Sequence, residues 1–165
     1  MSSHDSPFPG FFSAHQATLM KSVLNQVIPS DEKYPGAGDL GLVEYIDKAL
    51  GGSELLNQSH LALRRLFTDG TTMIEQISMT SYSTSFVSLT SEEQIRVLLS
   101  VEESLPQFFL SLKRHTYDGY YTNPQILQIA GAPLRPPQPL GHSLDSGDLS
   151  SLESVRSRGN IYKDV

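Results

Sequence analysis

The segment 13–29, SAHQATLMKSVLNQVIP, carries both a start signal and a stop signal for a helix. Ser13 and Gln16 have the spacing of a capping box, in which each side chain accepts a hydrogen bond from the backbone N–H of the other residue. Apolar residues then recur at helical spacing, and Pro29 follows as a residue that does not continue a helix. The pattern predicts a helix over 14–27, and its repetition along the chain sets the fold class.

Similar signals recur along the chain. The second predicted helix is capped by Asp39 and stopped by Gly51 and Gly52, and the third is capped by Ser53 and broken by Thr-Asp-Gly at 68–70. A short helix over 73–79 follows, and then one that starts with a capping box of Thr90 and Glu93 and one that starts at Pro106. The last is a short helix over 123–130, with Pro124 at its first position and Gly131 past its end. Only 82–89 has a composition that suits a strand. We therefore predict an all-α fold, a small irregular helical bundle with an extended Pro-rich C-terminal arm.

These patterns divide the chain into three regions. Residues 1–10 are rich in Ser, Pro and Gly and are predicted to be a flexible lead, whereas 11–131 form the helical domain. From 132 to 165 the chain has few large apolar residues at core spacing, and four prolines fall within 133–139. A polyproline segment leaves its backbone groups exposed and suits a surface crossing. Two interpretations of 132–165 stay open, a disordered tail or an extended arm that binds a partner.

The composition disfavours several classes of function. The formal net charge is −6 with no basic tract, which argues against nucleic-acid and anionic-membrane binding. Cysteine is absent, so the chain has no disulfide, no thiolate metal site and no cysteine nucleophile. No apolar run approaches the length of a membrane span.

The first residues, MSSHDSPFPGFFSAHQ, contain neither the pattern of a secretion signal nor a twin arginine. A cytoplasmic location is therefore expected. A periplasmic location would follow if a partner carries the export signal or if the chain has been trimmed.

Residues suited to catalysis or cofactor binding do not form a convergent set. No two of the five histidines are three or four residues apart, so no helical two-histidine metal motif is present. Adjacent acids such as Glu92 and Glu93 point about 100° apart on a helix and do not face one substrate. The letters GxGxxG occur at 36–41, but a dinucleotide site requires a preceding strand, and a polar loop precedes this stretch. We predict no catalytic residue, no metal and no cofactor site in this chain.

The stretch 115–124, HTYDGYYTNP, places three tyrosines between a basic pair and a proline. We interpret it as a turn between two helices, in which Gly119 allows the bend and Pro124 starts the next helix. Tyrosine offers a large contact area with a polar tip, which suits a protein interface, but it also fills cores. For Tyr120 and Tyr121 both interpretations stay open.

Three longer segments follow one another in a recognisable order. They are FFSAHQATLMKSVLNQVIPSD, GAGDLGLVEYIDKALGG and FFLSLKRHTYDGYYTNPQILQIAGAP, and the end of the chain adds RPPQPLGH and VRSRGNIYKDV. In this order they resemble the gluconate 2-dehydrogenase subunit 3 family, the small subunit of membrane-linked sugar and gluconate dehydrogenases. Each motif is short, and the specificity of the resemblance comes from their joint order over most of the chain.

The resemblance implies a noncatalytic helical subunit that binds and stabilises a large FAD-dependent oxidoreductase of the glucose–methanol–choline type. That partner would hold the FAD and oxidise a hydroxyl of a sugar, glycoside or sugar acid, so no cofactor is expected in this chain. In some complexes of the family a c-type cytochrome accepts the electrons. This chain has no Cys-x-x-Cys-His motif and so is not that cytochrome.

Within this resemblance, the residues expected to contact the partner lie in the tyrosine-rich turn and in the arm that follows it. They are Thr116, Gly119, Tyr120, Tyr121, Asn123, Pro124, Arg135, Pro136, Pro137 and Pro139.

Two alternatives to a subunit stay open. One is a stand-alone helical enzyme that acts through His115, Asp118 and Tyr120. The other is a helical adaptor protein whose segment PLRPPQP offers the PxxP spacing recognised by aromatic grooves.

Overall fold

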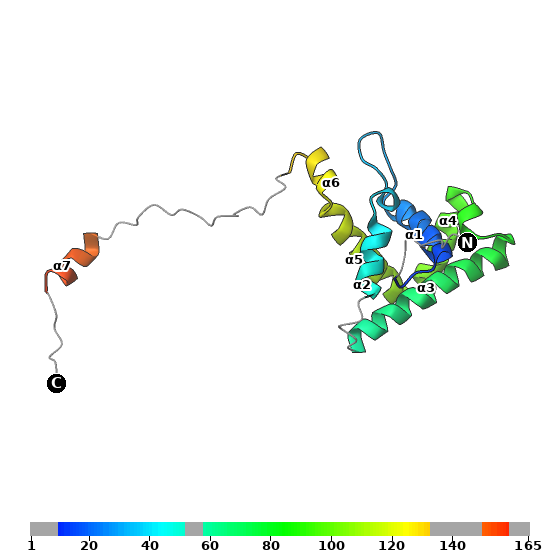
Figure 1. Cartoon of the computed structure of the whole chain (residues 1–165), viewed down its shortest axis with the longest axis horizontal. Coiled ribbons are helices and arrows are strands. Elements are labelled where there is room, and N and C mark those ends of the chain that lie inside the picture. Colours follow the sequence, from blue (N-terminus) through cyan, green and yellow to red (C-terminus); the bar gives the residue numbers. More distant parts are fainter. Residues whose placement is uncertain (1–9, 52–57, 133–149, 159–165) are drawn as a thin grey trace, which may run out of the picture. The chain divides into compact units, whose positions relative to one another are not determined.

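The computed structural model describes residues 10–51, 58–132 and 150–158, and the regular secondary structure of these ranges is entirely helical (Figure 1). The predicted all-α class is therefore confirmed. The chain divides into two units, Met1–Ala132 and Pro133–Val165. The described part of the second unit holds only a 3-10 turn, η4 (Ser150–Leu152), and a short helix, α7 (Glu153–Arg156). The predicted flexible lead and most of the predicted Pro-rich arm lie outside the described residues.

Helix α1 (Ala14–Val27) has the predicted bounds. The capping box forms in both directions, with the Gln16 N–H donating to Ser13 Oγ at 3.3 Å and the Ser13 N–H donating to Gln16 Oε1 at 3.0 Å. Residues on more than one face of α1 are buried, because the helix contacts α2, α3, α4 and α5. Its buried residues are Ala17, Leu19, Met20, Val23 and Leu24.

A buried carboxylate fixes the segment that leads into α1. The backbone N–H of Phe12 donates to Oδ1 of Asp47 at 2.7 Å, and both side chains are almost fully buried. Gly10 lies directly against the same carboxylate, and a Cβ atom on this residue would overlap it. Because a buried carboxylate is costly without hydrogen-bond donors, this contact defines where the chain enters the core.

Helix α2 (Leu42–Gly51) forms where it was predicted, but Asp39 does not cap it. Asp39 is instead the last residue of a 3-10 turn, η1 (Ala37–Asp39), and its carboxylate pairs with the Lys21 ammonium at 3.0 Å. The residue before α2 is Gly41, whose φ of +72° is the left-handed conformation that glycine adopts without strain. The capping prediction failed because the side chain of Asp39 is held by α1.

Helix α3 (Gln58–Tyr82) is a single helix of 25 residues, and the break predicted at 68–70 is wrong. The short helix predicted over 73–79 is part of the same helix (Figure 1). Gly70 lies in its middle, where the Phe108 ring of α5 packs so closely that a Cβ on Gly70 would lie 2.5 Å from ring carbons. Gly70 therefore allows α3 and α5 to pack closely where they cross. The predicted cap Ser53 lies outside the described residues.

The segment 82–89 forms no strand. Helix α3 ends at Tyr82, Ser83 takes a φ of 56°, and a 3-10 turn, η3 (Phe86–Ser88), follows. The Glu75 carboxylate organises this connection, since it accepts hydrogen bonds from Ser85 Oγ at 3.0 Å and from the Phe86 N–H at 3.3 Å. Phe86, in the 3-10 turn, is fully buried. The apolar residues that suggested a strand therefore include a core residue of a helical turn.

The remaining helices begin at the predicted residues. Helix α4 (Ser91–Ser104) starts with the Thr90 and Glu93 capping box, α5 (Pro106–Tyr121) starts with proline, and α6 (Pro124–Ile129) follows Asn123. Leu105 separates α4 from α5, so these two helices form a hairpin. Gly131, with a φ of +70°, follows α6 as predicted. In these places the decisive interactions are local and can be read from the chain.

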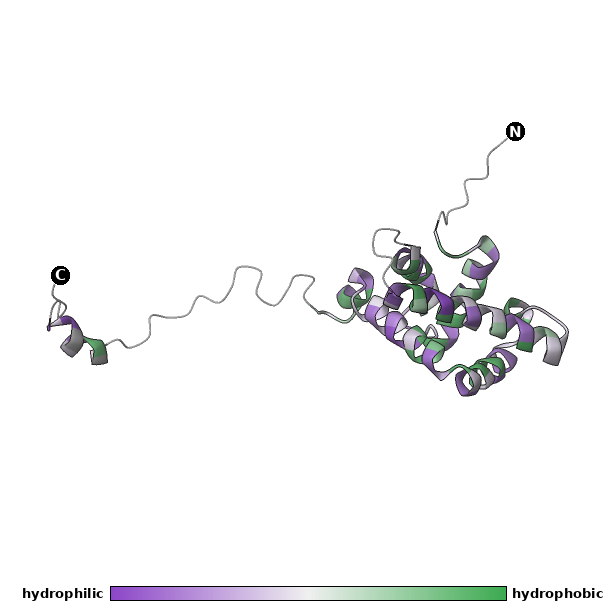
Figure 2. Cartoon of the chain, turned by 90° about the horizontal axis from the view of Figure 1, so that it is seen from below, coloured by the Kyte–Doolittle hydropathy of each residue, from purple (hydrophilic) through white to green (hydrophobic). Residues whose placement is uncertain are grey.

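An aromatic cluster around Phe67 of α3 lies in the centre of the helical unit. The Phe67 ring meets the rings of Phe12, Phe108 and His115 edge to face, at centroid distances of 6.3, 5.5 and 5.8 Å. Such geometry adds to the stabilisation from burial. Apolar and polar residues alternate along the surrounding helices, as expected for helices with one buried face (Figure 2). None of the described helices has the length and apolar content needed to cross a bilayer.

We predict that Gly70→Ala destabilises the domain, although alanine has a helix propensity about 1 kcal/mol better than glycine. The added methyl group would press on the Phe108 ring, and overpacking of this kind costs about 1–3 kcal/mol. Urea unfolding followed by circular dichroism measures the change in the free energy of unfolding.

Gly51→Ala is the matched control, because it is also a helical glycine and a Cβ there would meet nothing closer than 3.7 Å. It should leave stability unchanged or raise it slightly. A Gly70→Ala variant as stable as Gly51→Ala would show that the α3–α5 crossing is looser than described.

Candidate partner-binding surface

The stretch HTYDGYYTNP spans the end of α5, a two-residue connection and the start of α6. Thr116 is fully buried, and its hydroxyl donates to the Leu112 carbonyl oxygen at 2.7 Å. Gly119 lies inside α5, so the prediction that it allows a bend between two helices is wrong. A Cβ on Gly119 would lie 3.0 Å from the Tyr45 ring and 3.2 Å from Leu42, both on α2. This glycine allows α2 and α5 to approach closely.

Tyr120 belongs to the core of the domain. Its side chain is 4% exposed, and its hydroxyl donates to the Pro35 carbonyl oxygen at 3.0 Å. Burial raises the pKa of Tyr120 above its ordinary value, and the negative charge of Asp31 raises it further. Of the two interpretations left open for this residue, the structure supports the core.

Asn123 connects α6 to the rest of the domain. Its side-chain oxygen accepts a hydrogen bond from the Gln125 N–H at 2.9 Å, which caps α6. Its amide group donates to the Leu40 carbonyl oxygen at 3.2 Å, just before α2. The residue is half-buried, and both its side-chain oxygen and its amide nitrogen bond inside the domain.

Tyr121 and Pro124 are the predicted contact residues that lie at the surface. The Tyr121 side chain is 62% exposed and rests against Tyr117, with ring centroids 6.1 Å apart. Of the expected contact residues, Thr116, Gly119 and Tyr120 are buried inside the domain. Contact between a partner and any of the expected residues stays a prediction. The four arm residues lie outside the described residues, and they are Arg135, Pro136, Pro137 and Pro139.

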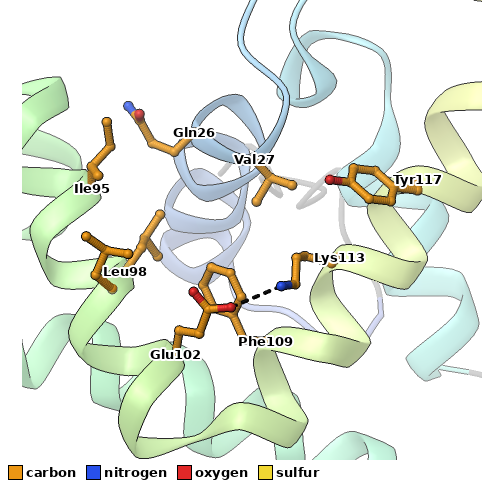
Figure 3. Close-up of a pocket in the computed structure, with 9 residues that line it drawn as sticks. Gln26, Val27, Ile95, Leu98, Glu102, Phe109, Lys113 and Tyr117 are labelled. Carbon is orange, nitrogen blue, oxygen red and sulfur yellow. Dashed lines mark hydrogen bonds and ion pairs between the residues drawn. The ribbon is translucent and has the colours of Figure 1, made fainter.

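An open pocket of about 310 Å³ lies between α4, α5 and the end of α1, and we name it the α4–α5 groove. Figure 3 shows α4 and α5 as its two walls, with the last turn of α1 between them. Its lining residues are Gln26, Val27, Ile95, Leu98, Leu99, Glu102, Phe109, Lys113 and Tyr117. Large apolar side chains are exposed along it: Ile95 is 45%, Leu99 is 53% and Tyr117 is 45% exposed.

The polar side chains of the α4–α5 groove are paired with one another or with the domain. The Lys113 ammonium lies 3.0 Å from a Glu102 carboxylate oxygen and 5.2 Å from the centre of the Phe109 ring. The Gln26 amide donates to Gln94 Oε1 at 2.7 Å. The groove therefore has an apolar lining and a balanced ion pair, and no group of unpaired charges converges in it.

The sequence analysis predicted the helix that begins after Thr90 but did not identify the groove that Ile95 and Leu99 line. The structure buries Leu98 and Val101 on α4 but leaves Ile95 and Leu99 exposed. A signal was present: the apolar residues of this helix cover a wider arc than one buried face needs, because neighbours are about 100° apart. That surplus of apolar residues indicates a second contact surface.

The GxGxxG letters at 36–41 have a structural explanation. A Cβ on Gly36 would lie 2.5 Å from Asn25 Oδ1, and one on Gly38 would overlap the Lys21 carbonyl oxygen. The Gly38 N–H donates to Asn25 Oδ1 at 2.7 Å. Together with the positive φ of Gly41, these contacts account for each glycine by packing against α1 or by backbone conformation.

The residues proposed for a stand-alone enzyme each have a separate partner. His115 Nδ1 lies 2.8 Å from the Ser111 carbonyl oxygen, and Asp118 lies 3.7 Å from the Arg114 guanidinium. Tyr120 is bonded to the loop before α2. Each of these three side chains is therefore held by a contact of its own, and Tyr120 is buried. Among the residues that the structure describes, no three His, Asp or Glu side chains group so as to hold a metal ion.

Together these features define a class of protein, a small all-α domain that presents an apolar groove at its surface. A family model described as gluconate 2-dehydrogenase subunit 3 matches residues 14–131, from the first residue of α1 to the glycine after α6. The chain belongs to this family, and the resemblance noted in its sequence is confirmed. The family description names a subunit, which implies a partner chain. No curated protein and no solved structure matches this chain.

We predict that Tyr120→Phe lowers the free energy of unfolding by about 1 kcal/mol, because it removes the hydrogen bond to the Pro35 carbonyl oxygen and leaves the ring in place. Tyr121→Phe is the matched control, since this side chain is exposed, and it should leave stability unchanged. Chemical unfolding of the three proteins at neutral pH measures the difference. Equal stability of the two variants would show that the hydrogen bond from Tyr120 to the Pro35 carbonyl oxygen does not stabilise the fold.

The wild type and Tyr120→Phe should also differ in how their stability depends on pH. The pKa of Tyr120 is raised in the folded state, so its contribution to stability is fully present below its unfolded pKa of about 10. This contribution is lost as the pH rises through the folded pKa. The stability advantage of the wild type over Tyr120→Phe should therefore stay constant up to about pH 10 and shrink above it. An advantage that grows above that pH would contradict the raised pKa.

Proposed function

We propose that this chain is the noncatalytic small subunit of a carbohydrate dehydrogenase or oxidase complex. It binds and stabilises a large FAD-dependent subunit of the glucose–methanol–choline type, and that subunit oxidises a hydroxyl of a sugar, glycoside or sugar acid. The observation that carries this proposal is the family match over residues 14–131, which spans the helical domain.

The arrangement of side chains supports a binding role. The candidate catalytic residues His115, Asp118 and Tyr120 each serve local structure. The described surface also carries large apolar side chains in a groove, and a subunit covers such a surface when it binds its partner. In this proposal the chemistry belongs to the FAD of the partner. Electrons leave through an acceptor that in some complexes is a c-type cytochrome.

Co-expression tests the proposal. It predicts a gene for a large flavoprotein next to the gene of this chain. Production of both chains, with an affinity tag on this chain only, should yield a two-chain complex with the absorbance spectrum of oxidised flavin. Without this chain, the large chain should be insoluble or should lose its flavin, because the subunit stabilises the folded, flavin-bound state by binding to it.

Two controls separate this role from the alternatives. The tagged chain expressed alone should be colourless and should show no turnover of gluconate, sugars or glycosides. Turnover by the isolated chain would overturn the proposal and favour a stand-alone enzyme. A large chain that is soluble, flavin-loaded and fully active alone, and that does not bind this chain, would overturn it as well.

A further inference from the structure

Exposed apolar side chains on two helices meet at the α4–α5 groove. Ile95 and Leu99 are one turn apart on α4, and both line the groove. Figure 3 shows Tyr117 of α5 on the opposite side of the groove from Ile95. Tyr121, 62% exposed, extends this surface along α5, one turn after Tyr117. Several large apolar side chains exposed around one groove mark a site that another molecule covers.

Hydrogen bonds and an ion pair join the walls of the groove to one another. Gln26, at the end of α1, is bonded to Gln94 of α4 at 2.7 Å, and its side-chain oxygen accepts from Ser91 Oγ at 3.2 Å. On the other side, Lys113 of α5 and Glu102 of α4 are joined at 3.0 Å. A surface joined in this way loses little conformational freedom on binding, which favours the association of a protein segment.

The charge of α4 indicates which protein covers the groove. The helix carries four glutamates and one arginine. A second copy of this chain would bring together two chains that each have a formal net charge of −6. The Lys113–Glu102 pair is already balanced, so the centre of the groove suits an uncharged apolar side chain. The complementary partner is therefore a different protein with an apolar centre and basic residues around it.

We propose that the α4–α5 groove is the surface that binds the large flavoprotein subunit, through a segment with an apolar centre flanked by Lys or Arg. This inference rests on the proposed function and adds the location and chemistry of the contact. The apolar anchor contacts Leu99 and Tyr117, and the basic flank faces Glu103 near the end of α4. Tyr117 contributes both ring area and a hydroxyl, the combination that interfaces favour.

Another concave surface lies on a different helix and gives a matched control. It is formed by the start of α3 and by Gln107, and Leu61 on this surface is 43% exposed. Arg65 and Asp69 make it more polar than the α4–α5 groove. Because α3 contributes no residue to that groove, Leu61→Asp makes the same chemical change at a similar exposure on a separate surface.

The experiment compares complexes of the full chain with its co-expressed flavoprotein. Leu99→Asp should weaken the binding of the large chain at least about tenfold, because it removes a central apolar side chain and places a carboxylate in an apolar contact. Ile95→Asp, at 45% exposure, should have the same effect as a second variant. Leu61→Asp should bind like the wild type. Circular dichroism should show that all three variants keep wild-type thermal stability, and Ile95→Asp decides the test if Leu99→Asp is unfolded.

The outcomes separate this inference from the proposed function. If the wild type does not bind the flavoprotein, the proposed function fails. If the wild type and both α4 variants bind equally well, the proposed function stands and the location is wrong. Loss of binding in Leu61→Asp alone would move the contact to α3. A wild-type chain that is a dimer by itself and becomes a monomer in Leu99→Asp would show that a second copy covers the groove, which also overturns the inference.

Discussion

The contact between Gly70 and Phe108 sets how closely α5 packs against α3. Without a Cβ at residue 70, the Phe108 ring rests directly on the backbone of α3, and Phe67, about one turn earlier, closes the other side edge to face. This fixes the first half of α5. A second close approach, of α2 against Gly119, fixes its last turn. Near its start α5 packs against Gly70 of α3, and near its end its own Gly119 packs against α2. These two close contacts define the rotation of α5 about its own axis.

That rotation separates two rows of residues on α5. One row, Phe108, Leu112 and Thr116, is fully buried, and the residue after each of its members, Phe109, Lys113 and Tyr117, lines the α4–α5 groove. Neighbours on a helix differ by about 100°, so a row that packs into the core places the next row at its edge. The groove is therefore a direct geometric consequence of the core. Its apolar content distinguishes it from an ordinary polar edge, and α4 adds Ile95 and Leu99 from the opposite wall.

The sequence predicts those parts of the structure that local chemistry decides. The capping boxes at Ser13 and Thr90 and the prolines that start α5 and α6 each involve groups within a few residues, so the helix starts could be identified from the chain. The errors share one cause. Gly70 and Asp39 were interpreted by local rules, although partners distant in the chain, Phe108 and Lys21, decide their roles. The candidate surface shows the same limit, because residue type alone does not distinguish the buried Tyr120 from the exposed Tyr121.

The position of the groove next to the core also limits how partner binding can be probed. A substitution in the buried row of α5, or at Gly70, would shift Phe109 and Tyr117 and so alter the groove without touching a partner. Loss of a partner in such a variant therefore does not identify a contact. Substitution of an exposed residue such as Leu99, which has more than half of its side chain in solvent, changes the surface and leaves the fold intact. A domain whose binding surface is one residue away from its core links its own stability to the assembly of the complex, because any loosening of α5 weakens both.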